Sequence, residues 1–160
     1  MMSHIPRSIR VYLEDQRIPY EVVDHPHDYT AQETAHHTHT PGRAFAKTVI
    51  LWIDGNYAMI VVPADHQVDL EQVRQALGAR TVNLAPEEEV RALCADCEVG
   101  AMPPFGPLYA MPMYIVADLA ANELITFNAG THTSAIRMRY ADFERLVTPQ
   151  EITLSRQVGL

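Results

Sequence analysis

One residue stands out by its type: of the twelve basic residues, only Lys47 is a lysine. It precedes the apolar run 49–53 and shares its side of the expected strand with Val49, Leu51 and Ile53. A lysine at a strand end ordinarily extends its ammonium group to water, and this is one interpretation. The other is a cation at the rim of a pocket, directed at a phosphate, a carboxylate or a developing oxyanion.

Two further segments contain glycines that would let the backbone come close to a bound molecule. Residues 100–107 read Gly-Ala-Met-Pro-Pro-Phe-Gly-Pro, which predicts a rigid loop that is neither helix nor ladder strand. Gly100 permits close backbone approach, and the prolines hold the direction of the neighbouring amides and carbonyls. Residues 128–132 are expected to form a turn at the end of a strand, with His132 able to donate a hydrogen bond. A plain β-turn is the alternative for that segment.

The histidines and cysteines offer weaker signals. His36, His37 and His39 have a spacing that a metal ion accepts, but they match no metalloenzyme signature, and histidine is common in a last helical turn. Cys94 and Cys97 form a C-x-x-C without the second pair that a zinc ribbon needs, and they follow an acidic helical stretch. We therefore expect two thiols at a helix end, no metal site and no cofactor.

Other motifs that would announce a reaction are absent from the sequence. There is no G-x-S-x-G, no P-loop and no G-x-G-x-x-G, so covalent serine hydrolysis, nucleoside triphosphate hydrolysis and dinucleotide binding lack support.

Length and charge limit the remaining classes. The 160 residues suffice for one domain with its own core, and a formal net charge of −8 disfavours a protein that tracks DNA through its phosphates. The apolar runs are too short to span a bilayer, so no membrane partner is expected. Residues 1–6 show no apolar leader region, which together with two cysteines predicts a cytoplasmic location.

The chain must position these residues with a mixture of helices and strands. Periodicity and capping signals predict helices at 8–17, from 31 to before Pro41, at 69–77, from Pro86 and at 141–147. Strands are expected at 20–24, 46–53, 57–62, 113–117, 124–128 and 135–139, with a hairpin turn at 54–56. This order predicts a single compact α/β domain with a mixed, largely antiparallel sheet flanked by helices, its core at 7–147 and a tail at 148–160.

The order of the motifs resembles the YbaK / prolyl-tRNA synthetase-associated editing domain family over residues 7–147. The segments that carry the resemblance are 44–49 (AFAKTV), 62–65 (VPAD) with 68–70 (VDL), 77–79 (LGA), 100–106 (GAMPPFG), 128–130 (NAG) and 142–143 (DF). The resemblance implies a compact α/β editing fold and trans-editing, the hydrolysis of the ester that joins a wrong amino acid to the 3′-terminal adenosine of tRNA. The branches that act on alanyl-tRNA carry a Lys-Asn pair, whereas Thr48 follows Lys47 in this sequence.

The resemblance also implies which residues form the site. Lys47 and His132 take the catalytic positions, and the family's G-x-x-x-P motif maps onto Gly100 and Pro104. The implied substrate contacts are Thr48, Gly100, Ala101, Met102, Pro103, Pro104, Ala129, Gly130 and Thr131. The implied partner is the CCA end of a mischarged aminoacyl-tRNA, with an aminoacyl-tRNA synthetase or an elongation factor as a second partner.

The chemistry agrees with the absence of a nucleophile motif. An aminoacyl ester is already activated and the neighbouring ribose 2′-OH can assist, so the protein needs positioning and oxyanion stabilisation. Two alternatives stay open: a non-catalytic module that binds an amino acid or a charged tRNA, and a metal-dependent hydrolase that uses the His36, His37 and His39 cluster.

Overall fold

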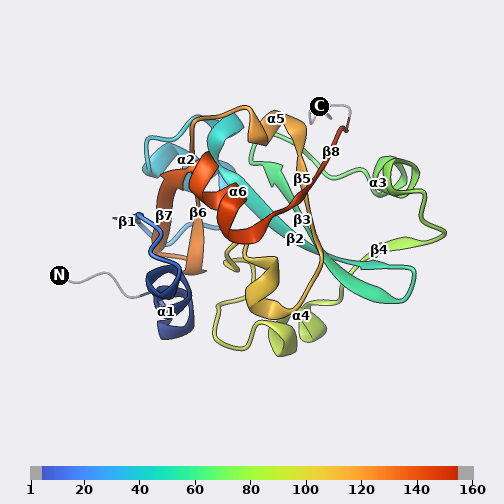
Figure 1. Ribbon diagram of the computed structural model, residues 1–160, viewed down its shortest axis with the longest axis horizontal. Coiled ribbons are helices and arrows are strands. Elements are labelled where there is room, and N and C mark those ends of the chain that lie inside the picture. Colours follow the sequence, from blue (N-terminus) through green and yellow to red (C-terminus); the bar gives the residue numbers. More distant parts are fainter. Residues whose placement is uncertain (1–4, 155–160) are drawn as a thin grey trace.

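The computed structural model describes residues 5–154 (Figure 1). Residues 1–4 and 155–160 lie outside the described residues. The expectation that residues 1–6 contain no leader region therefore falls mostly on residues that are not described. Among the described helices, none has the length and apolar character that crossing a bilayer requires.

The described strands form two sheets. The first has three antiparallel strands in the order β1 (Glu21–Asp24), β7 (Ser134–Arg139), β6 (Leu124–Thr131). The second has the order β4 (Val82–Leu84), β2 (Ala46–Ile53), β3 (Asn56–Pro63), β5 (Met113–Val116), β8 (Gln150–Ile152). In this sheet β5 runs parallel to β3 and to β8, and the other pairs are antiparallel. The expected mixed, largely antiparallel arrangement is confirmed, with β8 formed by residues that follow position 147.

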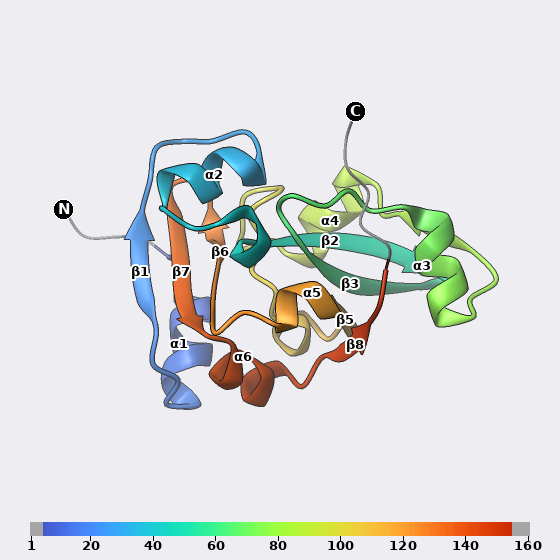
Figure 2. The same ribbon diagram turned by 90° about the horizontal axis from the view of Figure 1, so that it is seen from above.

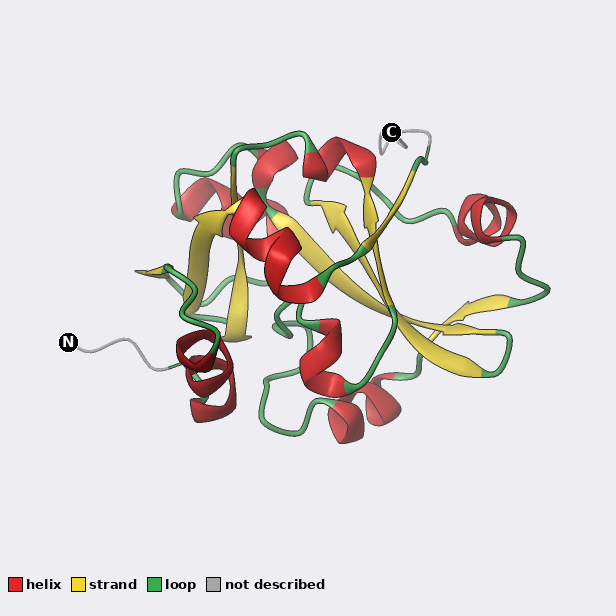
Figure 3. Cartoon of the chain, viewed as in Figure 1, coloured by secondary structure: helices red, strands yellow, loops and turns green. Residues whose placement is uncertain are grey.

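Helices surround the two sheets (Figures 1 and 3). They are α1 (Arg7–Asp15), α2 (Ala31–His37), α3 (Leu70–Leu77), α4 (Glu87–Leu93), α5 (Ala117–Ala120) and α6 (Tyr140–Val147), with the 3-10 helices η1 (Gly42–Ala44) and η2 (Gly106–Tyr109). All five expected helices are present. The sequence reading missed α5, β4 and β8, which are each three or four residues long and too short to show a periodic pattern.

The β2–β3 hairpin positions the only lysine. Asp54 and Gly55 turn the chain with φ of 48° and 87°, the left-handed values that a two-residue hairpin turn needs. Eight residue pairs follow, and near the open end of the hairpin Lys47 lies opposite Val62. Alternate residues of both strands enter two different apolar clusters, so both faces of the hairpin are covered.

The two sheets meet at the start of β2. Phe45 forms a parallel bridge with Thr126 of β6, and Figure 2 shows the three-stranded sheet on one side of this junction and the five-stranded sheet on the other. In the core, the buried rings of Phe105, Phe127 and Phe143 pack with their centroids 5.3 to 6.5 Å apart. Burying such a ring contributes roughly 1.5–3 kcal/mol, so Phe105 anchors the proline-rich loop to the core.

Residues 128–131 correct an expectation. They lie inside β6, which continues to Thr131, and the turn falls at His132 and Thr133. The pairing with β7 shifts register between Asn128 and Thr131, and Gly130 has a φ of 93°. The glycine therefore serves an irregularity within a strand, which the sequence reading mistook for a turn.

Two boundaries also differ from the sequence reading. Pro86 is the N-cap of α4 and not its first helical residue. The proline-rich segment is irregular only as far as Phe105, because η2 begins at Gly106. A Cβ at Gly106 would lie 2.7 Å from the carbonyl oxygen of Met111, so close packing explains the glycine that starts this short helix.

Candidate functional site

A cavity of about 720 Å³ opens where the two sheets meet. Its walls come from the β1–α2 connection, the start of β2, the turn after β3, the proline-rich loop and the end of β6. The lining residues are Asp28, Tyr29, Thr30, Ala31, Gln32, Thr34, Phe45, Ala46, Lys47, Thr48, Val49, Ala64, Asp65, His66, Gln67, Gly100, Met102, Asn128 and His132. The cavity thus collects Lys47, Thr48, Gly100, Met102 and His132 of the expected site.

Lys47 is half-buried in this wall. Its Nζ donates a hydrogen bond to the carbonyl oxygen of His66 at 3.0 Å. Burial lowers the pKa of the Lys47 ammonium group. Within residues 5–154 no carboxylate lies within ion-pair distance of Nζ, so its remaining N–H bonds are available to a bound molecule.

His66, whose carbonyl holds Lys47, is itself fixed on both sides of its ring. Nδ1 lies 2.8 Å from Oδ1 of Asp65, and Nε2 lies 3.1 Å from Oδ2 of Asp118 at the start of α5. Ionised carboxylates only accept hydrogen bonds, so both contacts are hydrogen bonds when both ring nitrogens carry a proton. We call Asp65, His66 and Asp118 the His66 cluster.

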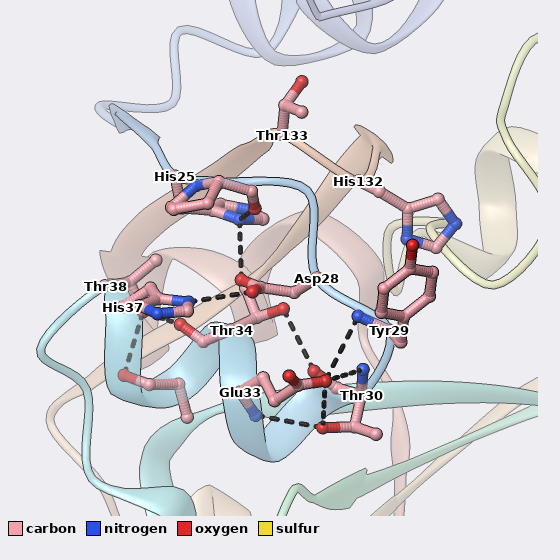
Figure 4. A network of polar contacts seen from close by, with 12 residues as sticks. His25, Asp28, Tyr29, Thr30, Glu33, Thr34, His37, Thr38, His132 and Thr133 are labelled. Carbon is pink, nitrogen blue, oxygen red and sulfur yellow. Dashed lines mark hydrogen bonds and ion pairs between the residues drawn. The ribbon is translucent and has the colours of Figure 1, made fainter.

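A second cluster, around the β1–α2 connection, has one carboxylate between two imidazoles (Figure 4). The buried carboxylate of Asp28 lies within hydrogen-bond distance of two imidazoles, with Oδ2 3.1 Å from Nδ1 of His25 and Oδ1 2.8 Å from Nδ1 of His37. The Nδ1 of His25 also lies 2.7 Å from the carbonyl oxygen of Pro26. The buried Nε2 of the same ring has no hydrogen-bond partner among residues 5–154. We call His25, Asp28 and His37 the Asp28 cluster.

The start of α2 forms the next part of the wall. Thr30 Oγ1 accepts a hydrogen bond from the backbone N–H of Glu33, and the Glu33 carboxylate accepts one from the backbone N–H of Thr30 (Figure 4). This pair of hydrogen bonds is a capping box, which fixes the start of α2. Tyr29, just before the cap, lines the cavity with 86% of its surface exposed. Its ring lies 5.3 Å from that of His27, which lies 5.2 Å from the ring of His132.

The proline-rich loop contributes backbone groups. The amide nitrogens of Gly100 and Met102 donate no hydrogen bond within the described part of the chain, and both residues line the cavity. Gly100 has a φ of 87°, which side-chain-bearing residues rarely adopt, and a Cβ there would lie 3.4 Å from Cε1 of His132. Two such amides in residues that line the same cavity as an ammonium group are suited to binding an oxyanion.

Two side-chain oxygens at the cavity also lack partners. Oγ1 of Thr48 and Oδ1 of Asn128 are buried and make no hydrogen bond within residues 5–154. Thr48 belongs to β2 and Asn128 to β6, the strands that meet at the sheet junction. Buried polar atoms without partners cost about 1–3 kcal/mol each, which a bound ligand can recover.

His132 is fixed by the loop that precedes it in the chain. Its Nε2 lies 2.7 Å from the carbonyl oxygen of Val99 and must donate to it, and its backbone N–H donates to Glu98. In the neutral ring this leaves Nδ1 as an acceptor. The hydrogen-bond donation expected of His132 is thus directed to Val99 in this structure.

The other expected substrate contacts do not line the cavity. They are Ala101, Pro103, Pro104, Ala129, Gly130 and Thr131. The carbonyl of Ala101 accepts a hydrogen bond from Gly130 at 2.7 Å, so these segments support each other. A Cβ at Gly130 would lie 2.6 Å from Cγ of Pro6, which shows that this glycine makes room for the N-terminal segment.

The histidines and cysteines of the described part of the chain do not form a metal site. Among residues 5–154 no group of three His, Cys, Asp or Glu side chains is placed to hold a metal ion. His37 contacts Asp28 instead. Burial raises the pKa of the Cys94 thiol to about 11 and that of Cys97 to about 12, and both thiols are free at the end of α4.

The sequence reading missed the β1–α2 wall, the His66 cluster and Asn128. Asp28, Asp65 and Asp118 look like ordinary surface carboxylates in the sequence, and their histidine partners lie up to 52 residues away. A faint signal did exist, because His66 follows directly on the VPAD run that ends β3.

The chain is similar to proteins of tRNA aminoacylation. The family model described as "Aminoacyl-tRNA editing domain" matches residues 25–146. A Multifunctional Ser/Thr-tRNA deacylase ProXp-y from Escherichia coli (strain K12) is 30% identical over 118 residues, covering 69% of this chain and 69% of the relative. A proline--tRNA ligase from Bacillus cytotoxicus is 31% identical over 99 residues, but the chain spans only 17% of that ligase.

Solved structures share the fold. A candidate trans-editing enzyme for prolyl tRNA synthetase superimposes with a TM-score of 0.81 at 22% identity, covering 97% of this chain and all of that one. A scaffold used for epitope grafting by computational design gives a TM-score of 0.84 at 21% identity over 98% of this chain. These likenesses confirm the editing-domain architecture.

Proposed function

The chain belongs to the aminoacyl-tRNA editing domain family, and we propose that it is a hydrolase that removes a wrongly attached amino acid from the 3′-terminal adenosine of tRNA. The observation that carries the proposal is the placement of the only lysine. Its ammonium group lies in the cavity wall and has no carboxylate partner within residues 5–154. The amides of Gly100 and Met102, which donate no hydrogen bond in that part of the chain, belong to residues that line the same cavity.

The reaction needs water and a site for negative charge. The oxygen of water adds to the ester carbonyl carbon, and the carbonyl electrons form an oxyanion that Lys47 and the loop amides stabilise. The attacking water loses one proton. The intermediate then collapses, the bond to the ribose oxygen breaks, and this oxygen takes up the equivalent of that proton as the amino acid leaves with the oxygen of water in its carboxylate. The ribose 2′-OH next to the ester assists, so no protein nucleophile is required.

The unpartnered oxygens suggest how the aminoacyl group is held. Thr48 Oγ1 and Asn128 Oδ1 can accept hydrogen bonds from the α-ammonium group or from a polar side chain of the amino acid. His132 offers Nδ1 as an acceptor for water or a ribose hydroxyl. Ala101, Pro103, Pro104, Ala129, Gly130 and Thr131 act in this proposal as the support of the wall.

The cavity mouth fits the end of a nucleic acid better than a duplex. The exposed ring of Tyr29 offers a flat face on which the terminal base can stack. With a net charge of −8, the chain has little surface for a phosphate backbone, so we propose that it grips the CCA end and that a synthetase or other partner supplies further tRNA contacts. A cytoplasmic location stays part of the proposal.

A panel of mischarged tRNAs tests the function. We expect the protein to hydrolyse at least one aminoacyl-tRNA well above its spontaneous rate, and the Escherichia coli relative makes seryl- and threonyl-tRNA the first members to try. Each assay is repeated with EDTA, which should leave the rate unchanged.

The two alternatives give other results in the same experiment. A non-catalytic module would bind charged tRNA without raising the rate for any member of the panel. A metal-dependent hydrolase would lose activity with EDTA and regain it with zinc.

A further inference from the structure

Asp118 and His66 form a link between two distant parts of the chain. The imidazole of His66 is 7% exposed and spans from Asp65, beside it in the turn after β3, to Asp118 at the start of α5. Both ring nitrogens make contacts, at 2.8 and 3.1 Å, so the ring cannot rotate without losing one of them. The turn that carries His66 is thereby tied to α5.

The same turn holds the ammonium group of Lys47. The carbonyl oxygen that accepts the hydrogen bond from Nζ is that of His66 itself, at 3.0 Å. A lysine side chain has four rotatable carbon–carbon bonds and loses up to about 2 kcal/mol of entropy when ordered, so a fixed acceptor is needed to hold its end in one place.

We propose that His66 and Asp118 are positioning residues for Lys47, holding the His66 carbonyl where it directs the ammonium group into the cavity. This proposal rests on the proposed function, in which Lys47 meets the oxyanion. Such a site depends on placement, because a displacement of 1 Å costs about a hundredfold in rate. Neither residue needs to touch the substrate.

Asp118 is the residue to change, because it is 59% exposed and its loss leaves the core intact. We expect Asp118→Ala to lower kcat at least about tenfold with KM nearly unchanged. Asp118→Asn, whose amide oxygen can still accept from Nε2, should retain most of the activity. Asp142→Ala is the matched control, since Asp142 pairs with Arg145 within α6 and does not line the cavity.

A spectroscopic readout separates positioning from a general structural role. Since the chain has one lysine, the NMR signals of its side-chain CH2 and ammonium groups belong to Lys47 alone, and they should shift in Asp118→Ala but not in Asp142→Ala.

The outcomes also separate this proposal from the function. Unshifted lysine signals or an unchanged kcat would overturn the positioning role while leaving the hydrolase intact. A wild-type protein that hydrolyses no aminoacyl-tRNA would refute the function, and the lysine signals would then still decide whether Asp118 places Lys47.

Discussion

The Asp28 cluster and the His66 cluster border the same cavity with opposite compositions. In the first, one carboxylate lies between two imidazoles; in the second, one imidazole lies between two carboxylates. The first spans only 13 residues and stabilises the β1–α2 connection. The second joins β3 to α5 and lies directly behind Lys47.

The difference concerns what each cluster needs in order to be satisfied. A carboxylate accepts from two neutral imidazoles, so Asp28 requires no extra proton on either ring. Two carboxylates are both satisfied only when His66 carries protons on both nitrogens. We therefore expect damage to the Asp28 cluster to reduce the stability of the fold. Damage to the His66 cluster is expected to displace the ammonium group of Lys47, which takes part in the proposed reaction.

The largest effect on stability is expected from Asp28→Ala. The substitution removes the buried acceptor of His37 Nδ1 and one of the two acceptors of His25 Nδ1, whose other acceptor is the Pro26 carbonyl oxygen. Within residues 5–154 the buried Nε2 of the same His25 ring already lacks a hydrogen-bond partner. We expect the free energy of unfolding to fall by about 3 kcal/mol, measured by urea denaturation.

His37→Ala is the control for that change. The side chain of His37 is 40% exposed and supplies one of the two hydrogen bonds, so its removal should cost only about 1 kcal/mol. If Asp28→Ala cost no more than His37→Ala, the contrast between the clusters would be lost.

Gly100→Ala changes the proline-rich loop, a part of the cavity wall that contains neither cluster, and its effect can be compared with theirs. A φ of 87° is strained for alanine, and the new Cβ would lie 3.4 Å from the His132 ring. We expect a loss of about 1–2 kcal/mol in the free energy of unfolding together with a lower deacylation rate. Thermal melts beside single-turnover kinetics measure both, and an unstrained, fully active variant would refute a role for this backbone conformation.

Sequence reasoning predicted the parts of the fold that depend on neighbours. The β2–β3 hairpin follows from two nearly continuous apolar runs separated by Asp54-Gly55-Asn56, and the start of α2 follows from Thr30 with Glu33. The separation into two sheets was not predictable, because the pattern of one strand does not state which strand it pairs with. Gly130 was misassigned for a related reason: a glycine in a strand bulge and a glycine in a turn look alike in sequence.

The candidate site divides in the same way. Lys47 and Gly100 were found because a lone lysine and a glycine before prolines are unusual by type. Asp28, His66 and Asn128 were missed because their places in the cavity wall depend on how the chain folds and not on their residue types. His66, for example, is held by Asp118, which lies 52 residues further along the chain.

The smallest effect on stability is expected from Asp118→Ala. Its carboxylate is more than half exposed, and such contacts contribute under about 1 kcal/mol. Urea denaturation should place this variant close to the wild-type protein, in contrast to Asp28→Ala. A loss as large as that of Asp28→Ala would mean that the His66 cluster is a structural element like the other.

The deacylation rate of Lys47→Ala under single-turnover conditions tests the central claim most directly. We predict that this variant hydrolyses the responsive mischarged tRNA no faster than the spontaneous rate, while its melting temperature stays near that of the wild-type protein. Lys47→Arg should not restore the rate, because a planar guanidinium group cannot occupy the place of a compact ammonium group. A folded Lys47→Ala protein that deacylates at the wild-type rate would contradict the account.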